Sequence, residues 1–387
     1  MKGTVLKKEM SQGRVFRDPS RLAEDFIPRR IQHRDRQIGN ITYYLSSLIR
    51  YGLLMNNIVI YGPPGTGKTH SVKSVLRTLT GEINSFYWPA YRATSSHSFF
   101  RGLLERNFDL SLHPRENISV YYSAFEKTIN TMKNILLVFD DIHYLLAKDP
   151  RGLDGLLFYL SRLNKNLGLI LIGNIRVNDL SLALEPPTTS SLRLRSVYFP
   201  KYNALEIKDI LMDRARDALT EEALKRSKGA IARIAALTAQ GWGSARYALD
   251  LLTEAGTVSE AVLGKDYIPQ EAVEQAEEML EVSKVEDQIR HLPQQPLAVL
   301  EAVYHLRGKR ELSTGDVYSA YEGICRERGI EPFSLRKVSD IITELDSAGL
   351  LSCRLVSRGR SGRTRLISWP PHHALEKVYE RERNEGI

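Results

Sequence analysis

The sequence predicts an α/β fold in three parts: a mostly parallel sheet domain, a small helical domain and a C-terminal winged helix-turn-helix. From about residue 36 to 200, strand-like apolar runs alternate with helical patterns, which is typical of a mostly parallel sheet. From about 203 to 280 the pattern is wholly helical. Pro293 and Pro296 then mark a boundary, after which three helical segments lead into an arginine-rich, strand-like stretch at 351–369. Three helices followed by a hairpin indicate a winged helix.

The spacing of apolar residues places each element. We expect strands at Ile58–Tyr61, Ser85–Trp88, Ile135–Phe139, Leu169–Ile172 and Val197–Phe199. The helical domain is expected to contain helices at Ala204–Leu219, Glu221–Ser227, Gly229–Thr238, Ser244–Ala255 and Pro269–Leu280. The C-terminal helices are expected near 296–307, 314–328 and 334–348. The predicted domains are a flexible basic N-terminus over 1–20, the sheet domain over 21–202, the helical domain over 203–285 and the winged helix over 286–387.

Length and composition limit the class of protein. The 387 residues exceed what one core usually supports, so two or three domains are expected. A hydrophobic content of 42% and a charged content of 26% are ordinary for a globular protein, and the net charge of +8 weakly favours an acidic partner. Only two cysteines are present, without metal-ligand spacing, and no apolar run is long enough to span a bilayer. We therefore expect a soluble, cytoplasmic protein with no membrane partner.

The segment GPPGTGKT is the most specific motif of the chain. It matches G-x-x-x-x-G-K-[ST] directly after a strand-like run, and an apolar pattern at helical spacing follows it. Such a loop points successive backbone N–H groups at phosphates, while Lys68 adds a positive charge and the Thr69 hydroxyl can ligate Mg²⁺. The motif predicts a bound nucleoside triphosphate. The residues expected to hold it here are Gly62, Pro63, Pro64, Gly65, Thr66, Gly67, Lys68, Thr69 and His70.

Two later segments complete the predicted nucleotide site. The apolar strand at Ile135–Phe139 ends in Asp140 and Asp141, which suits a carboxylate for the Mg²⁺ shell followed by one that orients a water molecule. The next strand ends at Asn174, which would lie between the two motifs and could sense the γ-phosphate; Asn178 and a simple strand cap are the alternatives. Together these motifs predict a P-loop ATPase.

The C-terminal domain has the features of a DNA-binding module. Ser334 begins a predicted helix whose buried stripe is Leu335, Val338, Ile341, Ile342 and Leu345. Arg336 and Lys337 lie at the start of this helix, where a recognition helix approaches base edges. The following hairpin carries five arginines around a glycine-rich turn, namely Arg354, Arg358, Arg360, Arg363 and Arg365. A cluster of this kind suits phosphate contacts, although a basic hairpin on a protein-binding winged helix is the alternative.

The combination of these motifs resembles the archaeal origin-recognition initiators, which are AAA+ relatives of the origin recognition complex. The resemblance also rests on the lid segment GSARYALDLL, which includes Arg246, and on the stretch from Phe26 to Ile38. It implies an AAA+ P-loop sheet domain with a helical lid and a C-terminal winged helix, with ATP or ADP and Mg²⁺ as cofactors. On the residues alone, Arg246 is most simply a solvated residue at a helix start. The resemblance implies that Asp140 is the metal-side acid, Asn174 and Arg246 are the two sensor residues, and Pro28 and Arg29 lie near adenine.

Departures from the family pattern affect the expected activity. Asp141 stands where the wider family most often has Glu, and Pro187 stands where an arginine finger is expected, with Arg193 or Arg195 as substitutes that the sequence cannot choose between. We therefore expect slow ATP hydrolysis. The segment 99–119 corresponds to an inserted element that touches DNA in the initiators, although a solvated helix face is an equal alternative. The candidate DNA contacts in this segment are Arg101, Arg106 and Arg115.

The function that the resemblance implies is an ATP-dependent initiator that recognises origin DNA. Its implied partners are double-stranded DNA, the replicative helicase that it helps to recruit, and other initiator copies, in a nucleoid-associated setting. ATP and ADP would act as a slow conformational switch. Two alternatives remain open from the sequence: an AAA+ regulator or remodeller of a protein partner, and a DNA-binding ATPase of transcription or of a mobile element.

Overall fold

The computed structural model describes residues 15–110, 113, 115–163, 167–241, 243–309, 312–357, 363–370, 375, 376, 378, 379 and 381. The chain divides into two compact units, Met1–Val273 and Glu274–Ile387. Within the described residues, no helix is both long and apolar enough to cross a membrane. The finer division into domains at 202/203 and 285/286 stays a prediction.

In the described part of the first unit, five strands form one sheet in the order β2-β3-β4-β1-β5. The pairings are parallel, with Val59 opposite both Leu171 and Ser196. The strands are β1 (Asn57–Tyr61), β2 (Asn84–Pro89), β3 (Ile135–Asp140), β4 (Leu167–Gly173) and β5 (Leu194–Tyr198). The predicted sheet is confirmed, although β5 begins at Leu194 rather than Val197. Because β3, β4 and β1 are parallel neighbours, their carboxyl ends meet at one edge.

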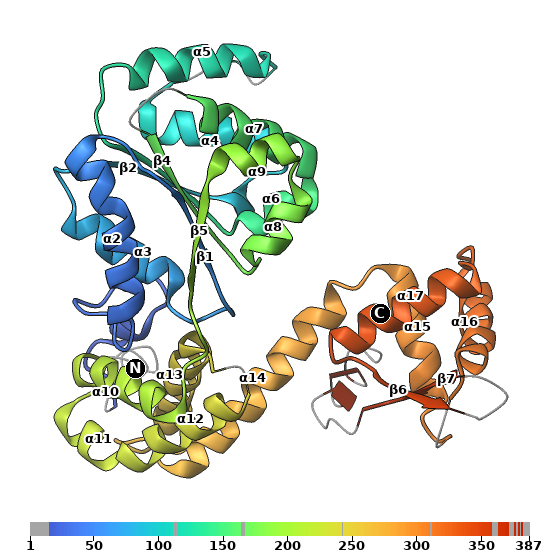
Figure 1. The fold of residues 1–387 in the computed structure, drawn as a ribbon. Coiled ribbons are helices and arrows are strands. Elements are labelled where there is room, and N and C mark those ends of the chain that lie inside the picture. Colours follow the sequence, from blue (N-terminus) through green and yellow to red (C-terminus); the bar gives the residue numbers. More distant parts are fainter. Residues whose placement is uncertain are drawn as a thin grey trace, which may run out of the picture. The chain divides into compact units, whose positions relative to one another are not determined.

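Helices cover both faces of the sheet (Figure 1). Ile58 and Ile60 of β1 pack into a core with α2 and α3, while Val59 between them packs into a second core beneath α4–α9. This alternation follows from the two-residue period of a strand. The covering elements are α2 (Asp35–Tyr51), α3 (Lys68–Thr78), η2 (Ala90–Arg92), α4 (Ser96–Phe108), α5 (Ile118–Ile129), α6 (Ile142–Lys148), α7 (Pro150–Arg162), α8 (Val177–Ala183) and α9 (Pro186–Leu192).

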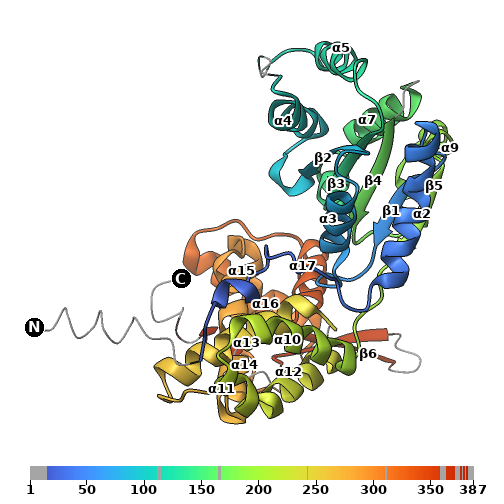
Figure 2. The same ribbon diagram turned by 90° about the vertical axis from the view of Figure 1, so that its left-hand side faces the viewer.

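A group of helices follows the sheet and forms the lid, where α10–α13 gather in a cluster apart from the strands (Figure 2). The helices are α10 (Ala204–Ala218), α11 (Glu221–Arg226), α12 (Lys228–Gln240), α13 (Ala245–Ala261) and α14 (Gln270–Arg290). Asn203 and Glu206 form a capping box at the start of α10, and the Ser244 hydroxyl accepts a hydrogen bond from the backbone of Tyr247 at the start of α13. The helix α14 continues to Arg290, ten residues past the predicted end at Leu280.

The predicted flexible N-terminus is described only from Val15 onward. Val15 is fully buried, and its carbonyl accepts a hydrogen bond of 3.0 Å from the backbone N–H of Thr220. Phe16 forms an isolated antiparallel bridge with Leu219, before the short helix η1 (Pro19–Leu22). The described part of this segment is therefore packed on the lid.

The second unit has the predicted winged-helix elements. Three helices, α15 (Gln294–His305), α16 (Thr314–Arg328) and α17 (Leu335–Ser347), enclose one core together with an antiparallel hairpin of β6 (Ser352–Ser357) and β7 (Arg363–Ser368). Leu312 forms a further bridge with Ile367. The predicted buried stripe of α17 is correct for Val338, Ile341, Ile342 and Leu345, but Leu335 is 48% exposed. Leu335 is the first residue of the helix, outside the turns that face the core.

Candidate nucleotide site and DNA-binding surface

The predicted nucleotide residues converge at the carboxyl edge of the sheet. The loop at Gly62 follows β1, Asp140 ends β3 and Asn174 follows β4, which lies between them. The strand order thus puts Asn174 between the two motifs, and its role as a sensor stays a prediction. Asn178 lies on α8, whereas Asn174 Oδ1 accepts a hydrogen bond of 3.1 Å from the Nζ of Lys68.

The loop from Gly62 to Thr69 is held by close contacts that leave no room for larger residues. Gly65 and Gly67 both have positive φ, of 71° and 83°. A Cβ on Gly65 would lie 1.9 Å from the Ser244 hydroxyl, and one on Gly67 would lie 2.9 Å from the Tyr202 hydroxyl. The loop thus needs glycine for its backbone conformation and for close packing against the lid.

Lys68 is the buried cation of the site. Its ammonium donates to the carbonyl oxygens of Gly62 and Pro63, both at 2.8 Å, and to Asn174. Burial lowers the pKa of Lys68 to about 8, while the carboxylates of Asp140 and Asp141 oppose part of this shift. These carbonyls satisfy the ammonium without a ligand, and a phosphate would offer it a charged partner in their place.

Asp140 and Thr69 supply the oxygen atoms that suit a magnesium ion. The Thr69 hydroxyl donates to Asp140 Oδ2 at 2.8 Å, and the Tyr87 hydroxyl donates to the same oxygen at 2.6 Å. Among the described residues there is no cluster of three or more metal-binding side chains. Mg²⁺ usually takes one or two protein oxygens and completes its shell with phosphates and water. Thr69 and Asp140 would hold the ion, which would neutralise phosphate charge.

Asp141 has a backbone conformation that is rare outside glycine. Its φ is 56°, and it precedes α6 without capping it through its side chain. Burial and the adjacent Asp140 carboxylate raise the pKa of Asp141, and His143, Lys68 and Arg246 partly oppose this shift. The environment of this carboxyl group therefore favours proton uptake more than that of an exposed carboxylate.

The lid contacts the loop directly through the start of α13. The backbone N–H of Ala245 donates to the Gly65 carbonyl at 3.0 Å. The next residue, Arg246, forms an ion pair with Glu24 and is about half exposed. The lid therefore brings Arg246 close to the phosphate-binding loop, where a Cβ added to Gly65 would lie 3.3 Å from the Arg246 Cβ. The sensor role of Arg246 stays a prediction.

The predicted residues around the base are less closely tied to the site. The Pro28 carbonyl accepts a hydrogen bond of 3.4 Å from Arg77, and Arg29 is exposed. His70 is partly buried on α3, where burial lowers its pKa and a hydrogen bond with the Glu24 backbone opposes the shift. The adenine contacts of Pro28, Arg29 and His70 stay predictions.

Three residues that support the site were missed from the sequence: Tyr87, Arg34 and Tyr202. Arg34 is 1% exposed and donates to the Thr66 carbonyl at 2.9 Å and the Pro200 carbonyl at 2.7 Å. Its guanidinium lies 3.6 Å from the ring centroid of Tyr202. Arg34 thus joins the loop to the segment that leads into the lid. The sequence offered one indication for Tyr87: it lies near the end of a predicted strand, and in the structure that strand pairs with β3.

The predicted recognition residues of the second unit are exposed. Ser334 caps α17, and Arg336 and Lys337 form no ion pair with the other residues that the structure describes. Arg365 is half-buried, and its Nη1 donates to the Ser339 carbonyl of α17 at 3.1 Å, so it fastens the hairpin to the helix. Arg354 is exposed on β6 and has an interaction partner. Arg358 and Arg360 lie outside the described residues, as does the side chain of Arg363.

Comparisons with known proteins cover nearly the whole chain. Family models match an AAA domain at residues 55–180, a Cdc6 AAA+ ATPase-type lid domain at 208–278, and a CDC6 C-terminal winged helix domain at 287–376. The ORC1-type DNA replication protein of Thermococcus onnurineus is 33% identical over 384 residues, covering 94% of this chain and 90% of that protein. The ORC1-type DNA replication protein 1 of Sulfurisphaera tokodaii is 36% identical over 369 residues, with 93% and 91% coverage.

The chain belongs to the ORC1-type DNA replication proteins. A solved structure agrees: the Aeropyrum pernix ORC1 protein in complex with DNA has a TM-score of 0.80 and 30% identity, and the match covers 96% of this chain and 98% of that one. The Cdc6p of Pyrobaculum aerophilum, at 19% identity and a TM-score of 0.58, shares the fold. The AAA+ sheet, the lid and the winged helix inferred from the sequence are thereby confirmed.

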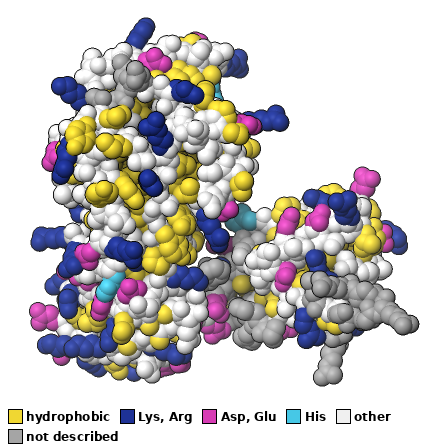
Figure 3. All heavy atoms as spheres, in the orientation of Figure 1, with side chains coloured by type: hydrophobic (Ala, Val, Ile, Leu, Met, Phe, Trp, Pro, Cys, Tyr) yellow, Lys and Arg dark blue, Asp and Glu magenta, His cyan; other side chains and the backbone are white. Residues whose placement is uncertain are grey.

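This ORC1-type chain has three arginines in the segment 99–119, which is predicted to be an inserted element that contacts DNA. Arg101 and Arg106 lie on α4 and line a cavity of about 510 Å³ beside Trp88, while Arg115 is exposed before α5. Arg101 lies 3.6 Å from Glu105, so one of the three is already partnered. On the face shown in Figure 3, the basic side chains of the first unit are scattered among acidic and apolar ones. Charge distribution on that face therefore does not single out a DNA surface.

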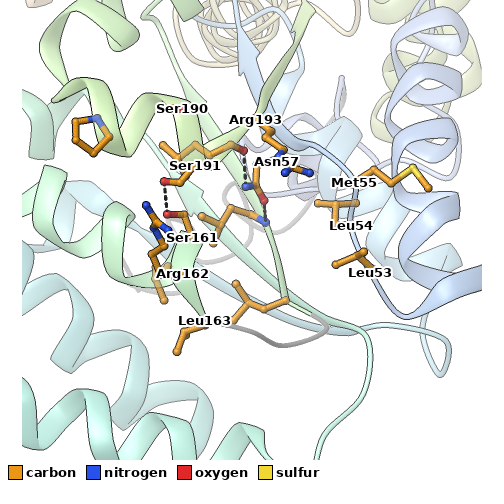
Figure 4. Close-up of a pocket in the computed structure, with 15 residues that line it drawn as sticks. Leu53, Leu54, Met55, Asn57, Ser161, Arg162, Leu163, Ser190, Ser191 and Arg193 are labelled. Atoms are coloured by element: carbon orange, nitrogen blue, oxygen red, sulfur yellow. Dashed lines mark hydrogen bonds between the residues drawn. The ribbon is translucent and has the colours of Figure 1, made fainter.

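A cavity of about 760 Å³ lies at the opposite edge of the sheet from the phosphate-binding loop (Figure 4). Its polar side chains mostly satisfy one another: Ser161 and Ser191 share a hydrogen bond of 2.6 Å, and Asn57 bonds the Leu192 carbonyl and the Leu169 N–H. Pro187 and Arg193, from the segment where an arginine finger is expected, line this cavity. The charged groups of the predicted nucleotide site converge at the other, carboxyl edge of the sheet.

Proposed function

We propose that the protein is an ATP-controlled, DNA-binding replication initiator that marks origin DNA and helps to recruit the replicative helicase. The observation that carries the proposal is that Lys68, Thr69, Asp140 and Asn174 meet at one edge of an AAA+ sheet in an ORC1-type chain that ends in a winged helix. The relative of solved structure from Aeropyrum pernix is described in complex with DNA, which supports a DNA partner here.

In this proposal each residue of the site has a separate role in binding ATP or ADP and Mg²⁺. The loop N–H groups and Lys68 bind phosphates, Thr69 and Asp140 hold the metal, and Asn174 and Arg246 report the third phosphate. Asp141 orients the attacking water, but its arm is one methylene shorter than that of Glu, and Pro187 offers no arginine to a neighbouring copy. Hydrolysis is therefore slow, and the nucleotide acts mainly as a switch.

The rate of hydrolysis provides one test. We expect multiple-turnover ATP hydrolysis well below ~1 s⁻¹, the lower end typical of enzymes, with ADP retained. A steady-state phosphate-release assay measures this rate on the purified chain, with and without duplex DNA. Rates well above that level would show that Asp141 is an efficient base or that an arginine is supplied from elsewhere.

The binding partner provides the decisive test of function. The purified protein with ATP is incubated with fragments of the genome from which the chain derives, and the retained sites are mapped. An initiator should occupy a few discrete sites clustered at replication origins. Occupancy of many promoters would favour a transcriptional role, occupancy of an element's own ends would favour a mobile-element role, and failure to retain DNA would favour the regulator of a protein partner.

A further inference from the structure

The N-terminal strap, which we define as residues 15–26, is fastened to the lid at its first end. The backbone N–H of Val15 donates to Glu260 Oε1 of α13 at 2.6 Å, and that of Arg17 donates to the Ala218 carbonyl at 2.8 Å. The ring of Phe16 fills the space beside Gly256, where an added Cβ would lie 2.2 Å from it. The strap therefore belongs to the same packed body as α10 and α13.

A buried arginine fastens the other end of the strap. Arg214 of α10 is 5% exposed and donates to the carbonyls of Ala23 at 3.0 Å and Phe26 at 3.1 Å. Its guanidinium also lies 4.5 Å from the ring centroid of Phe26. Glu24 lies between these two anchored carbonyls, so its backbone is fixed relative to the lid.

In this position, Glu24 forms an ion pair with Arg246 on the first turn of α13. Arg246 is also within electrostatic reach of the phosphate-binding loop. Burial is the main cause of the lowered pKa of Lys68, and the charge of Arg246 adds to it. Arg246 therefore pairs with a carboxylate and also lies close to the phosphate-binding loop, since a Cβ added to Gly65 would lie 3.3 Å from the Arg246 Cβ.

We propose that Glu24 is the counter-ion that competes with the third phosphate of ATP for Arg246, and so sets how strongly the protein distinguishes ATP from ADP. The proposal rests on the proposed nucleotide-binding function. The N-terminal strap and α13 belong to the same packed body. The ion pair between Glu24 and Arg246 is therefore kept when the lid moves relative to the sheet. ATP must replace Glu24 as the partner of Arg246, whereas ADP lacks the phosphate that would do so. Glu24 is thus a positioning residue that acts through Arg246.

A second carboxylate supports this arrangement. Asp250 follows Arg246 by four residues on α13, one helical turn along. Burial and then the charge of Glu24 raise the pKa of Asp250, while Arg246 opposes the shift. Withdrawal of Arg246 toward a phosphate would leave Glu24 and Asp250 near each other without their shared cation. This repulsion adds to the free energy that ATP binding must supply.

The test compares the affinity of a non-hydrolysable ATP analogue with that of ADP by isothermal titration calorimetry, with Mg²⁺ present. Glu24→Gln should strengthen analogue binding by up to about fivefold, the range for an exposed ion pair, and leave ADP unchanged. Glu24→Asp, which keeps the charge, should stay nearer the wild type. Asp25→Asn is the matched control, because it removes the same charge from the adjacent exposed residue, and it should change neither affinity.

The double variant decides whether Glu24 acts through Arg246. In an Arg246→Ala background, Glu24→Gln should have no further effect on the analogue. Equal changes for analogue and ADP, a persistent effect without Arg246, or weaker analogue binding by Glu24→Gln would each overturn the inference while leaving the nucleotide site intact. A wild-type chain that binds neither nucleotide would instead overturn the proposed function, and the inference with it. Unchanged melting temperatures would exclude misfolding as the cause.

Discussion

The nucleotide edge of the sheet and the basic end of the winged helix are both suited to bind phosphates, but by different physical means. Lys68 is 8% exposed and has three oxygen partners within 3.1 Å. Arg336 and Lys337 are exposed on the first turn of α17 and form no ion pair within the described part of the chain. One site is prearranged by burial, whereas the other presents mobile charges to solvent.

This difference determines how each region should respond to change. Water has little access to a buried cation that binds a phosphate and cannot take its place. Loss of the cation therefore lowers the affinity for the phosphate strongly, and salt changes this effect little. Exposed arginines gain from the release of counter-ions, so each loss has a smaller effect that depends on salt and adds to the others. Variants of the two regions should therefore differ both in the size of their effects and in salt dependence.

The largest effect is expected at Lys68. Lys68→Ala should weaken ATP binding by about a hundredfold or more, since it removes a buried charged partner of the phosphates, at roughly 3 kcal/mol. The fold should persist, because Lys68 serves the ligand and is not part of an apolar core. Titration calorimetry measures the affinity and circular dichroism the fold. Wild-type affinity in this variant would refute the nucleotide site.

The pH dependence of ATP affinity should follow the lowered pKa of Lys68. Below about pH 8 the free protein already carries the charged lysine, so this group adds no pH dependence. Above that pH, binding must take up a proton because phosphate favours the charged form, and affinity should fall by up to about tenfold per pH unit. Lys68→Arg, which stays charged, is the control and should lack this fall. A flat profile for the wild type would contradict the burial of an ionisable lysine at the phosphates.

Arg336 should affect specificity more than general affinity. It lies at the start of the recognition helix, where side chains reach base edges, so Arg336→Ala should cost roughly 1–3 kcal/mol on the preferred duplex and relax discrimination. Fluorescence anisotropy on specific and scrambled duplexes measures both. An equal loss on the two duplexes would assign Arg336 to the phosphate backbone.

The hairpin arginines should give the smallest effect per residue. If Arg358, Arg360 and Arg363 each neutralise one phosphate, the triple Ala variant should lose roughly 0.9 per residue from the slope of log affinity against log salt concentration. It should weaken specific and random duplexes alike. Arg365→Ala is a useful contrast, since its bond to the Ser339 carbonyl predicts a loss of hairpin stability as well. An unchanged slope for the triple variant would remove the hairpin from the DNA-binding surface.

The sequence predicted those features that depend on local pattern. The strands follow from short apolar runs, and the loop at Gly62 follows from a motif whose glycines and lysine act within eight residues. The extension of α14 to Arg290 was missed because the segment after Leu280 is charged and has little apolar periodicity, although its residues favour helix. Position 335 was assigned to the core because the helical period alone does not show where the core ends.

The residues that sequence reasoning missed act through tertiary contacts. Arg34 reaches carbonyls at Thr66 and Pro200, and no spacing rule links positions so far apart. Glu24 is one acidic residue in a polar stretch until the fold brings it to Arg246. Tyr87 is the exception, since parallel neighbouring strands end at the same edge, and its hydroxyl could have been placed near Asp140 from strand order alone.

In the proposed function, the nucleotide controls a protein that binds duplex DNA through charged contacts and distinguishes DNA sequences. The most direct measurement is the affinity of the wild-type protein for a duplex recovered from its mapped sites and for a scrambled duplex, across a salt series, with ATP and with ADP. We predict that log affinity falls linearly with log salt concentration on both duplexes, that the mapped site binds more tightly, and that the nucleotide changes this preference. Weak binding without salt dependence, equal on both duplexes and with either nucleotide, would contradict the claim and favour a regulator of a protein partner.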